Sequence, residues 1–304
     1  MSDSGVAHQR KSAIDALPLT RVSKNTGFFS GIASSYSEIW RYRDLLGQLT
    51  RREIRAKYKA SVLGILWSLV RPLVQLLIYY FAIGQVLGAA RSIPDFAIYV
   101  FSGLTLWGLF VEVLTLSPQS LLGNGGIIKK VYVPRELFTL SAVANALLNF
   151  GIQLVLLVAF TYITGSGLAF AEMGYGAMAL AIVIVLSFGL GLLISAVNVY
   201  VRDVEHFVGV LLTIFFWLSP VVYTFAFIKT TLQGFWLQLY LANPVTIAVM
   251  GFQRATWRAG SQTLDAWPDD LMSRLAVALV VTVVFTFIAQ RIFSRMQRSI
   301  AQEL

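Results

Sequence analysis

The side chains able to do chemistry inside apolar segments are few, and the clearest of them is a carboxylate. Glu112 lies near the inner end of an apolar segment, where transporters driven by an ion gradient keep their coupling acids. Asn145, Asn149 and Gln153 recur at every fourth residue of another apolar segment, so they form one polar stripe on a helix. Hydrogen bonding between helices is the favoured role of this stripe, and a wall facing a sugar is the alternative. A single deep acid gives little support for proton coupling.

No catalytic or nucleotide-binding motif accompanies these residues. The sequence has no GxxxxGK[ST] phosphate loop, no HExxH and no GxSxG. It has no cysteine, which excludes disulfides, thiol catalysis and cysteine-bound metals. Of its two histidines, His8 lies in a polar leader and His206 at the edge of an apolar segment, where an interface role is favoured over a ligand or base. We therefore expect no catalytic, cofactor or metal site in this chain.

The composition points to a membrane as the solvent. Hydrophobic residues make up 57% of the chain and charged residues 13%, with a mean hydropathy of +0.71. Soluble domains carry about 25% charged residues, and a soluble fold could not hide this much apolar surface from water. We expect an all-α integral membrane protein with six transmembrane helices, each near the ~20 residues that cross a hydrocarbon core. The expected spans are about 72–90, 96–116, 137–163, 174–198, 207–227 and 273–290.

An amphipathic helix is expected before the first span, because apolar and basic residues alternate there at helical spacing. Such a helix lies along a membrane surface and favours anionic headgroups, and a solvated helix packed on a partner is the alternative. Residues 62–70 are expected to dip into the interface, since Pro72 interrupts helical hydrogen bonding. The chain is thus divided into a flexible cytoplasmic tail without a signal peptide (1–37), the amphipathic interfacial helix (38–61), the six-span domain (62–292) and a cytoplasmic C-terminal tail (293–304).

Two further features lie in the parts of the chain that we expect on the outer side of the membrane. The segment 228–272 is apolar and aromatic but interrupted at Asn243-Pro244, so a pair of external re-entrant helices between spans five and six is expected. A seventh and an eighth span are the alternative. Gly84 and Gly88 form a GxxxG pattern that allows close helix approach, although this pattern is common.

The distribution of basic residues sets the orientation. With the N-terminus inside, the only basic residues outside are Arg91, Lys229, Arg254, Arg258 and Arg274, out of 24 in all. Cytoplasmic loops of membrane proteins carry the excess of Lys and Arg, so both termini are expected in the cytoplasm. The net charge of +9 therefore reflects topology, and we expect no nucleic-acid partner.

Four segments in the same order resemble those of one transporter family. LTRREIRAKYKASVLGILWSLVRPL (49–73), NVYVRDVEHF (198–207), WLSPVVYT (217–224) and LANP (241–244) are similar to segments of the permeases of polysaccharide-exporting ABC transporters. That family includes O-antigen, capsule and teichoic acid exporters, and the resemblance extends from about 38 to 292. It implies a homodimer with two separate ATPase subunits, which hold ATP and Mg, and export of a lipid-linked glycan across the bacterial plasma membrane.

Because the resemblance implies a separate ATPase subunit, we expect the loop 118–136 to form a short helix that receives force from that subunit. Apolar residues would fill a groove of the ATPase and basic residues would meet its acidic rim. Membrane anchoring of the basic residues is the alternative, and a local ion pair explains the second loop equally well. The coupling residues are Ile127, Ile128, Lys129, Lys130, Val131, Tyr132 and Arg135, with Arg202, Asp203 and Glu205 as a secondary contact.

Two more sets of residues are expected to meet the substrate. Aromatic rings stack on the apolar faces of sugars without fixed hydrogen-bond geometry, although aromatic residues also anchor membrane interfaces. The channel candidates are Trp67, Tyr79, Tyr80, Phe81, Trp107, Phe216, Trp217 and Tyr223. A pyrophosphate headgroup needs convergent cations, although general attraction to anionic lipid explains the same charge. The headgroup candidates are Arg51, Arg52, Arg55, Lys57 and Arg71.

The main alternative function is an ion-coupled secondary transporter of a lipid or glycan. Such a protein needs deep titratable pairs and inverted repeats, whereas this sequence shows one deep acid and no clear repeat. A membrane-bound glycosyl- or acyltransferase would need clustered acids or histidines near the interface, and a passive channel is compatible with composition alone.

Overall fold

The computed structural model describes residues 40–59, 64–130, 133–262 and 266–303, and these form helices and connecting loops without a strand. Residues 1–40 and 41–304 are separate units, and the architecture below is that of the second. The predicted tail 1–37 and the predicted coupling residues Val131 and Tyr132 lie outside the described residues. The principal helices are α3 (Arg43–Tyr58), α4 (Trp67–Tyr79) with its π-helical extension η2 (Tyr80–Val86), α5 (Ala89–Ser92), α6 (Phe96–Gly123), α7 (Gly125–Ile128), α8 (Glu136–Ile163), α9 (Met173–Tyr200), α10 (Val204–Trp217), α11 (Phe225–Thr231), α12 (Gly234–Leu241), α13 (Pro244–Thr256) and α14 (Leu271–Glu303).

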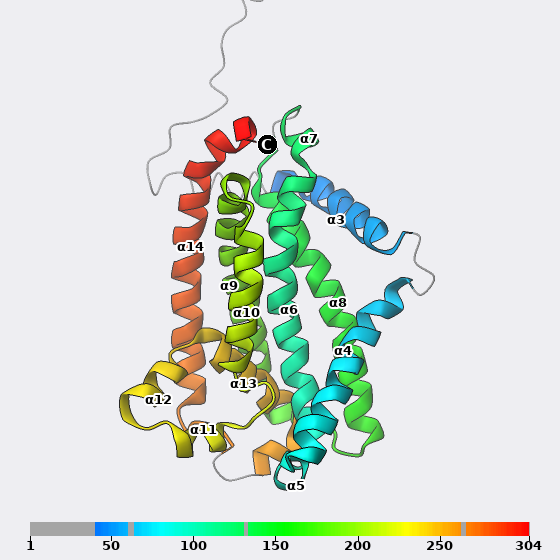
Figure 1. Ribbon diagram of the computed structural model, residues 1–304, viewed down its shortest axis with the longest axis vertical. Coiled ribbons are helices and arrows are strands. Elements are labelled where there is room, and N and C mark those ends of the chain that lie inside the picture. The colour runs from blue at the N-terminus through cyan, green and yellow to red at the C-terminus, as the bar shows by residue number, and fades with distance from the viewer. Residues whose placement is uncertain (1–39, 60–63, 131–132, 263–265, 304) are drawn as a thin grey trace, which may run out of the picture. The chain divides into compact units, whose positions relative to one another are not determined.

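Five helical segments are long and apolar enough to cross a membrane: α4 with η2, α6, α8, α9 with the short turn before it, and α14. The helix α3, the helix α7 and the C-terminal end of α14 lie at one end of this unit, and α5, α11 and α12 lie at the other (Figure 1). The shorter helix α10 and the irregular residues 218–224 after it provide a further pass between these ends. An all-α membrane fold is therefore confirmed.

The first span differs from the prediction, because Pro72 does not mark its beginning. The helix starts at Trp67, includes Pro72 in its second turn and continues to Val86. A proline near a helix start removes one hydrogen bond, which membrane helices tolerate where neighbouring groups compensate. The helix thus begins before the predicted start of the span at about 72, while a dip of 62–70 into the membrane interface stays a prediction. Gly88 ends the span in a left-handed conformation with φ of 79°.

The fifth span also differs, since helix α10 ends at Trp217 and not near 227. Pro220 lacks a backbone N–H, so the carbonyls around it need other donors. The Tyr99 hydroxyl donates to the carbonyls of Pro220 at 2.9 Å and Tyr223 at 2.5 Å. The Gln253 amide donates to the Pro220 carbonyl at 3.0 Å. Irregular backbone is tolerated at membrane depth only where protein covers it, and these two side chains provide that cover.

Close packing around α6 and α9 depends on glycines at a few positions. A Cβ atom on Gly103 would lie 2.8 Å from Gln253 Nε2 and 3.0 Å from the Val221 carbonyl, so a glycine lets the irregular segment pack on α6. A Cβ on Gly189 would lie 2.6 Å from Thr286 Oγ1 of α14. Small residues thus bring the backbones together, as is common between membrane helices.

The predicted GxxxG contact is confirmed at only one of its two glycines. Gly84 packs against Phe96, since a Cβ there would lie 2.9 Å from the ring. Gly88 has open space around it and serves the turn described above.

The external segment bends at the predicted break. Helices α12 and α13 meet at 74°, and the Asn243 side chain accepts a hydrogen bond from the Val245 N–H at 3.0 Å with Pro244 in the first helical turn. These helices have 8 and 13 residues, so neither is long enough to be a separate span. The bend fits the predicted re-entrant pair, whose depth in a membrane stays a prediction. At the C-terminus, the residues predicted as a tail continue α14 to Glu303.

Candidate functional site

The deep carboxylate Glu112 is paired with a lysine from the amphipathic helix. Lys57 Nζ lies 2.7 Å from Glu112 Oε1, and the Asn149 amide donates to the same oxygen. The side chains of Lys57 and Glu112 are 36% and 20% exposed. This contact joins α3 to α6 and α8, and it gives the negative charge of Glu112 a fixed counter-charge.

A second polar contact joins α3 to the same two helices one turn earlier. The hydroxyls of Ser120 and Ser141 donate to the Glu53 carboxylate at 2.6 and 3.0 Å. Arg52 donates to the Asn124 side chain, whose own amide donates to the Ser120 carbonyl at 2.7 Å. Because Asn124 immediately precedes α7, helix α3 is hydrogen-bonded to the base of the predicted coupling helix.

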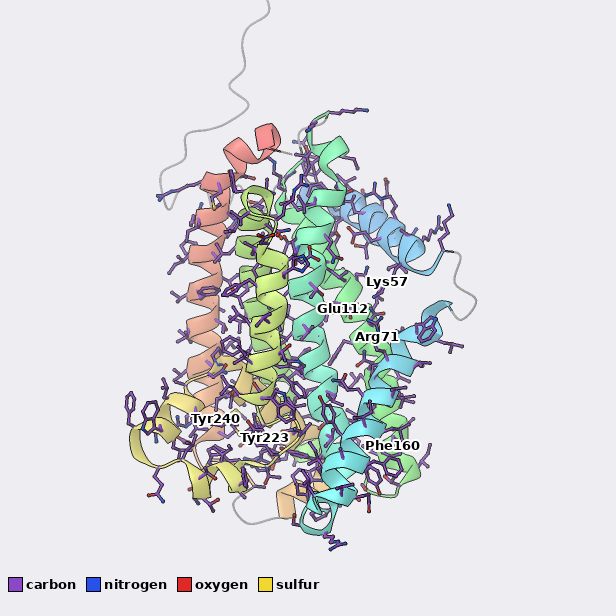
Figure 2. All side chains as sticks on the ribbon, viewed as in Figure 1. Lys57, Arg71, Glu112, Phe160, Tyr223 and Tyr240 are labelled. Atoms are coloured by element: carbon purple, nitrogen blue, oxygen red, sulfur yellow. The ribbon has the colours of Figure 1, made fainter. Side chains whose placement is uncertain are left out.

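These contacts divide the predicted headgroup residues into two groups. All five are exposed, but Arg52 and Lys57 also donate to side chains of this chain, which leaves Arg51, Arg55 and Arg71 as the second group. Figure 2 labels the paired Lys57 and Glu112, and it labels Arg71 on α4. The arginines of the second group therefore remain the candidates for binding an anionic headgroup.

The predicted polar stripe on α8 is buried within the chain. Asn145, Asn149 and Gln153 are 3%, 4% and 8% exposed. Burial favours the interpretation that the stripe bonds between helices, and Asn149 does so through Glu112.

Four of the eight predicted channel aromatics form one cluster from three helices. The ring of Phe216 stacks on Tyr79 with centroids 5.6 Å apart, and it contacts Trp107 at 5.7 Å and Trp217 at 5.5 Å. Trp107 and Phe216 are buried, whereas Trp217 is 53% exposed. We call Tyr79, Trp107, Phe216 and Trp217 the aromatic cluster; it links α4, α6 and α10 at the point where α10 ends.

The other four aromatics are not part of this cluster. Tyr80 contacts Phe81 at 5.9 Å, and Phe81 is 60% exposed on η2. The Tyr223 hydroxyl donates to the Trp217 carbonyl at 2.7 Å, which connects it to the end of α10. Trp67 is 52% exposed at the beginning of α4.

The predicted coupling residues lie on two loops at the α3 end. Lys129 and Lys130 are exposed and Ile127 is half-buried, whereas Ile128 is 8% exposed and packs within this chain. Arg135 is half-buried at the beginning of α8. Only part of the predicted apolar surface of this loop is therefore available to another protein.

The second loop is connected to α6. Arg202 and Asp203 are exposed, while Glu205 accepts a hydrogen bond from the Gln119 amide at 2.7 Å. This bond joins the C-terminal part of α6 to the first turn of α10, the helix that carries Phe216. His206 is exposed at the beginning of α10, and its interface role stays a prediction.

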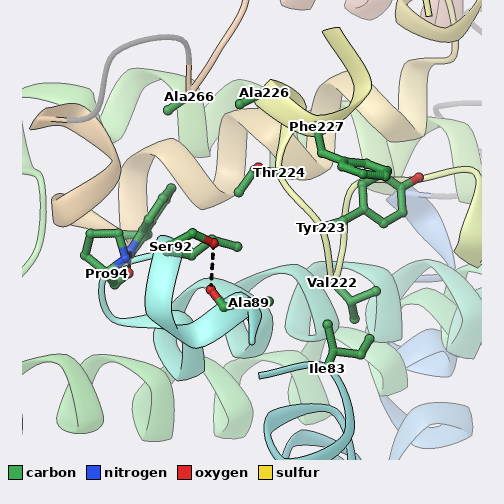
Figure 3. Close-up of a pocket in the computed structure, with 12 residues that line it drawn as sticks. Ile83, Ala89, Ser92, Pro94, Val222, Tyr223, Thr224, Ala226, Phe227 and Ala266 are labelled. Atoms are coloured by element: carbon green, nitrogen blue, oxygen red, sulfur yellow. Dashed lines mark hydrogen bonds between the residues drawn. The ribbon is translucent and has the colours of Figure 1, made fainter. Parts of the chain in front are cut away.

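A cavity of about 350 Å³ lies at the opposite end, between α5 and α11 (Figure 3). Its walls are mostly apolar, and Tyr223 connects it to the aromatic cluster through the Trp217 carbonyl. The Trp257 indole N–H donates to the Pro94 carbonyl at 2.8 Å and fixes one wall. Residues lining the cavity include Ile83, Pro94, Val222, Tyr223, Phe227 and Trp257.

Sequence reasoning missed several residues that organise these sites. Gln253 and Tyr99 hold the irregular segment after α10, and Glu53 anchors α3. A glutamine in a mostly apolar helix, Pro244–Thr256, was the available signal for Gln253. No local pattern indicates the partner of Glu53, because Ser120 and Ser141 are 67 and 88 residues away.

Comparison with known proteins gives consistent matches. Residues 44–257 match the profile of a family described as ABC-2 type transporter. The chain is similar to the O-antigen export system permease protein RfbA of Klebsiella pneumoniae, with 26% identity over 264 residues that cover 86% of this chain and 95% of the relative. A protein of the same name from Myxococcus xanthus is 28% identical over 273 residues, which cover 88% and 98%. The polysialic acid transport protein KpsM of Escherichia coli is 24% identical over 201 residues, which cover 65% and 75%.

Proposed function

This chain belongs to the ABC-2 type transporter family, and we propose that it is the permease subunit of an ATP-driven exporter that moves a lipid-linked polysaccharide across the bacterial plasma membrane. The names of its relatives, which concern export of O-antigen and transport of polysialic acid, support a polysaccharide as the cargo. The two termini face the cytoplasm in this proposal, so the end with α3 and α7 is cytoplasmic. The positive-inside distribution of basic residues supports that orientation.

The aromatic cluster is the observation that carries this proposal. Rings from α4, α6 and α10 meet where α10 gives way to irregular backbone, and Trp217 presents its exposed side there. Sugar C–H faces stack on such rings while sliding past them, because stacking requires no fixed hydrogen-bond geometry. A neutral, aromatic surface therefore suits a long glycan better than an ion.

Energy comes from a separate subunit in this proposal. The sequence has no phosphate-binding loop, so ATP and Mg are bound by two ATPase subunits that work with a homodimer of this chain. Lys129, Lys130, Arg202 and Asp203 are exposed on two loops at the proposed cytoplasmic end. Force applied there reaches α10 through the Gln119–Glu205 hydrogen bond and reaches α3 through the Arg52–Asn124 contact.

The lipid carrier approaches beside α3 and α4 in this proposal. Arg51, Arg55 and Arg71 are exposed there and attract a phosphate or pyrophosphate headgroup. Arg71 lies on the same helical segment as Tyr79, two turns earlier, so headgroup and sugar would contact the same helix.

Depletion of this protein in its host tests the proposal. We expect lipid-linked glycan to accumulate on the cytoplasmic leaflet, where mass spectrometry of extracted lipids identifies it. Purification of the tagged chain is expected to bring down a soluble ATPase with a phosphate-binding loop. An unchanged pool of lipid-linked glycan, together with the absence of such an ATPase, would refute the proposal.

A further inference from the structure

Arg291 lies at the boundary between the buried and the exposed faces of α14. Its side chain is 9% exposed, whereas its neighbours on the helix surface, Ile288 and Ile292, are 46% and 42% exposed. Arg291 follows the long apolar part of α14, in the C-terminal half of that helix.

The helix α14 runs parallel to α9 in this region. The Thr286 hydroxyl donates to the Val185 carbonyl at 2.8 Å, and the Tyr200 hydroxyl donates to the Met296 carbonyl at 3.3 Å. Between these two bonds, the part of α9 that contains Ser195 runs beside the part of α14 that contains Arg291. Ser195 Oγ is buried without a hydrogen-bond partner among the described residues.

Two guanidinium nitrogens of Arg291 are also buried and unpaired. Nε and Nη2 have no acceptor within the part of the chain that the structure describes. The Phe287 ring, 5.1 Å from the guanidinium carbon, is the aromatic neighbour of this charge. An arginine keeps its charge at any physiological pH, and a buried charge is expected to be paired. An acceptor from outside this chain would complete the site.

The exposed face of α14 next to Arg291 is aliphatic. Val277, Val280, Val281, Val284 and Ile288 are between 46% and 63% exposed. Their spacing places them on one face of the helix, which forms a stripe about 16 Å long that leads away from Arg291. A cation at the end of an aliphatic stripe matches a phospholipid, which has a phosphate at one end of its acyl chains.

We propose that Arg291 binds the phosphate of an anionic phospholipid whose acyl chain lies along this stripe. Nε and Nη2 form the side of the guanidinium that pairs with two oxygens at once. The long side chain turns from its buried position toward the exposed face between Ile288 and Ile292 when it binds. We place this lipid in the inner leaflet, and that placement rests on the orientation given in the proposed function.

Delipidated, purified full-length protein in detergent tests this site with phosphatidylglycerol as the probe. We expect phosphatidylglycerol to raise the thermal midpoint of the wild type and to stay bound in native mass spectra. Arg291→Met keeps the side-chain volume and removes the charge, so we expect about a tenfold loss in phosphatidylglycerol affinity. Its midpoint without lipid should be unchanged or higher, because the unpaired charge is gone. Arg291→Lys should lie between the two, since an ammonium lacks the paired nitrogens.

Arg295→Met is the matched control, because Arg295 is exposed one turn later on the same helix. It should retain most of the lipid-dependent stabilisation. Equal losses in the two Met variants would overturn the proposal in favour of general attraction to anionic lipid. Full stabilisation by inorganic phosphate, or none by phosphatidylglycerol, would overturn it as well. These readouts involve neither ATP nor export, so they are independent of the test of the proposed function.

Discussion

Lys57 on the amphipathic helix and Glu112 in the second span form an ion pair at 2.7 Å, and Asn149 donates to the same carboxylate oxygen. The acid that most resembled an ion-coupling group is therefore held by a lysine from a different segment. This pairing favours a role in fixing α3 against α6 and α8 over a role in carrying protons.

Removal of Glu112 should destabilise the protein. We expect Glu112→Ala to lower the free energy of unfolding by about 1–3 kcal/mol, because it removes the carboxylate that Lys57 and Asn149 bind and that joins α3 to α6 and α8. The combined change of Lys57→Met with Glu112→Leu should recover part of the loss. Thermal unfolding in detergent measures this, with Asp44→Ala as the control, since the Asp44 side chain is 88% exposed. Equal effects of Glu112→Ala and Asp44→Ala would contradict a structural role for the pair.

Gly103 should tolerate no side chain. We expect Gly103→Ala to cost about 1–3 kcal/mol, because its Cβ would meet the Gln253 amide and the Val221 carbonyl. Gly209→Ala is the control, since nothing lies within 4 Å of a Cβ at that position in α10. The melting temperatures of both variants provide the comparison. A neutral Gly103→Ala would show that the irregular segment is not packed tightly on α6.

Gln253 should be required for the break after α10. Gln253→Leu leaves the Pro220 carbonyl with one donor fewer, so we expect a loss of about 1–3 kcal/mol in unfolding free energy. Hydrogen exchange of residues 218–224 should rise in the variant. Gln85→Leu serves as control because Gln85 is exposed on η2. Unchanged exchange in 218–224 would argue that Tyr99 alone holds the segment.

The aromatic cluster should determine the rate of export. We expect Phe216→Ala to reduce export several-fold, because Phe216 joins Tyr79, Trp107 and Trp217 and each ring contact contributes about 0.5–1.5 kcal/mol. Phe215→Ala is the matched control, since the neighbouring ring is 42% exposed. Export of glycan to the cell surface is compared at equal protein abundance. Equal export by the two variants would rule out this cluster as the sugar-contacting surface.

Charge reversal on the coupling loop should weaken binding of the ATPase. We expect Lys129→Glu with Lys130→Glu to reduce the amount of ATPase that co-purifies, because both side chains are exposed at the proposed cytoplasmic end. Lys229→Glu, on α11 at the opposite end, should leave co-purification unchanged. An undiminished ATPase signal in the double variant would favour the interpretation that these lysines only set the orientation.

The all-α membrane fold was predictable because apolar length and the loop distribution of basic residues are local properties of the sequence. The capped break at Asn243-Pro244 was predictable for the same reason. The start of α4 and the end of α10 were not predictable, because Pro72 lies inside a helix and the break at Pro220 depends on donors more than 30 residues away.

Residue types identified the aromatic candidates, but only the fold selects Tyr79, Trp107, Phe216 and Trp217 from the eight. Likewise, Arg52 and Lys57 were identified as cations, whereas their partners, Asn124 and Glu112, are 72 and 55 residues away.

Reconstitution into proteoliposomes tests most directly whether this chain is powered by a separate ATPase. The purified chain, with and without the ATPase that co-purifies with it, is supplied with lipid-linked glycan, and the glycan exposed on the opposite leaflet is measured. We expect movement only when both proteins and hydrolysable ATP are present, and none with a proton or sodium gradient alone. Movement driven by a gradient through the isolated chain would contradict this function.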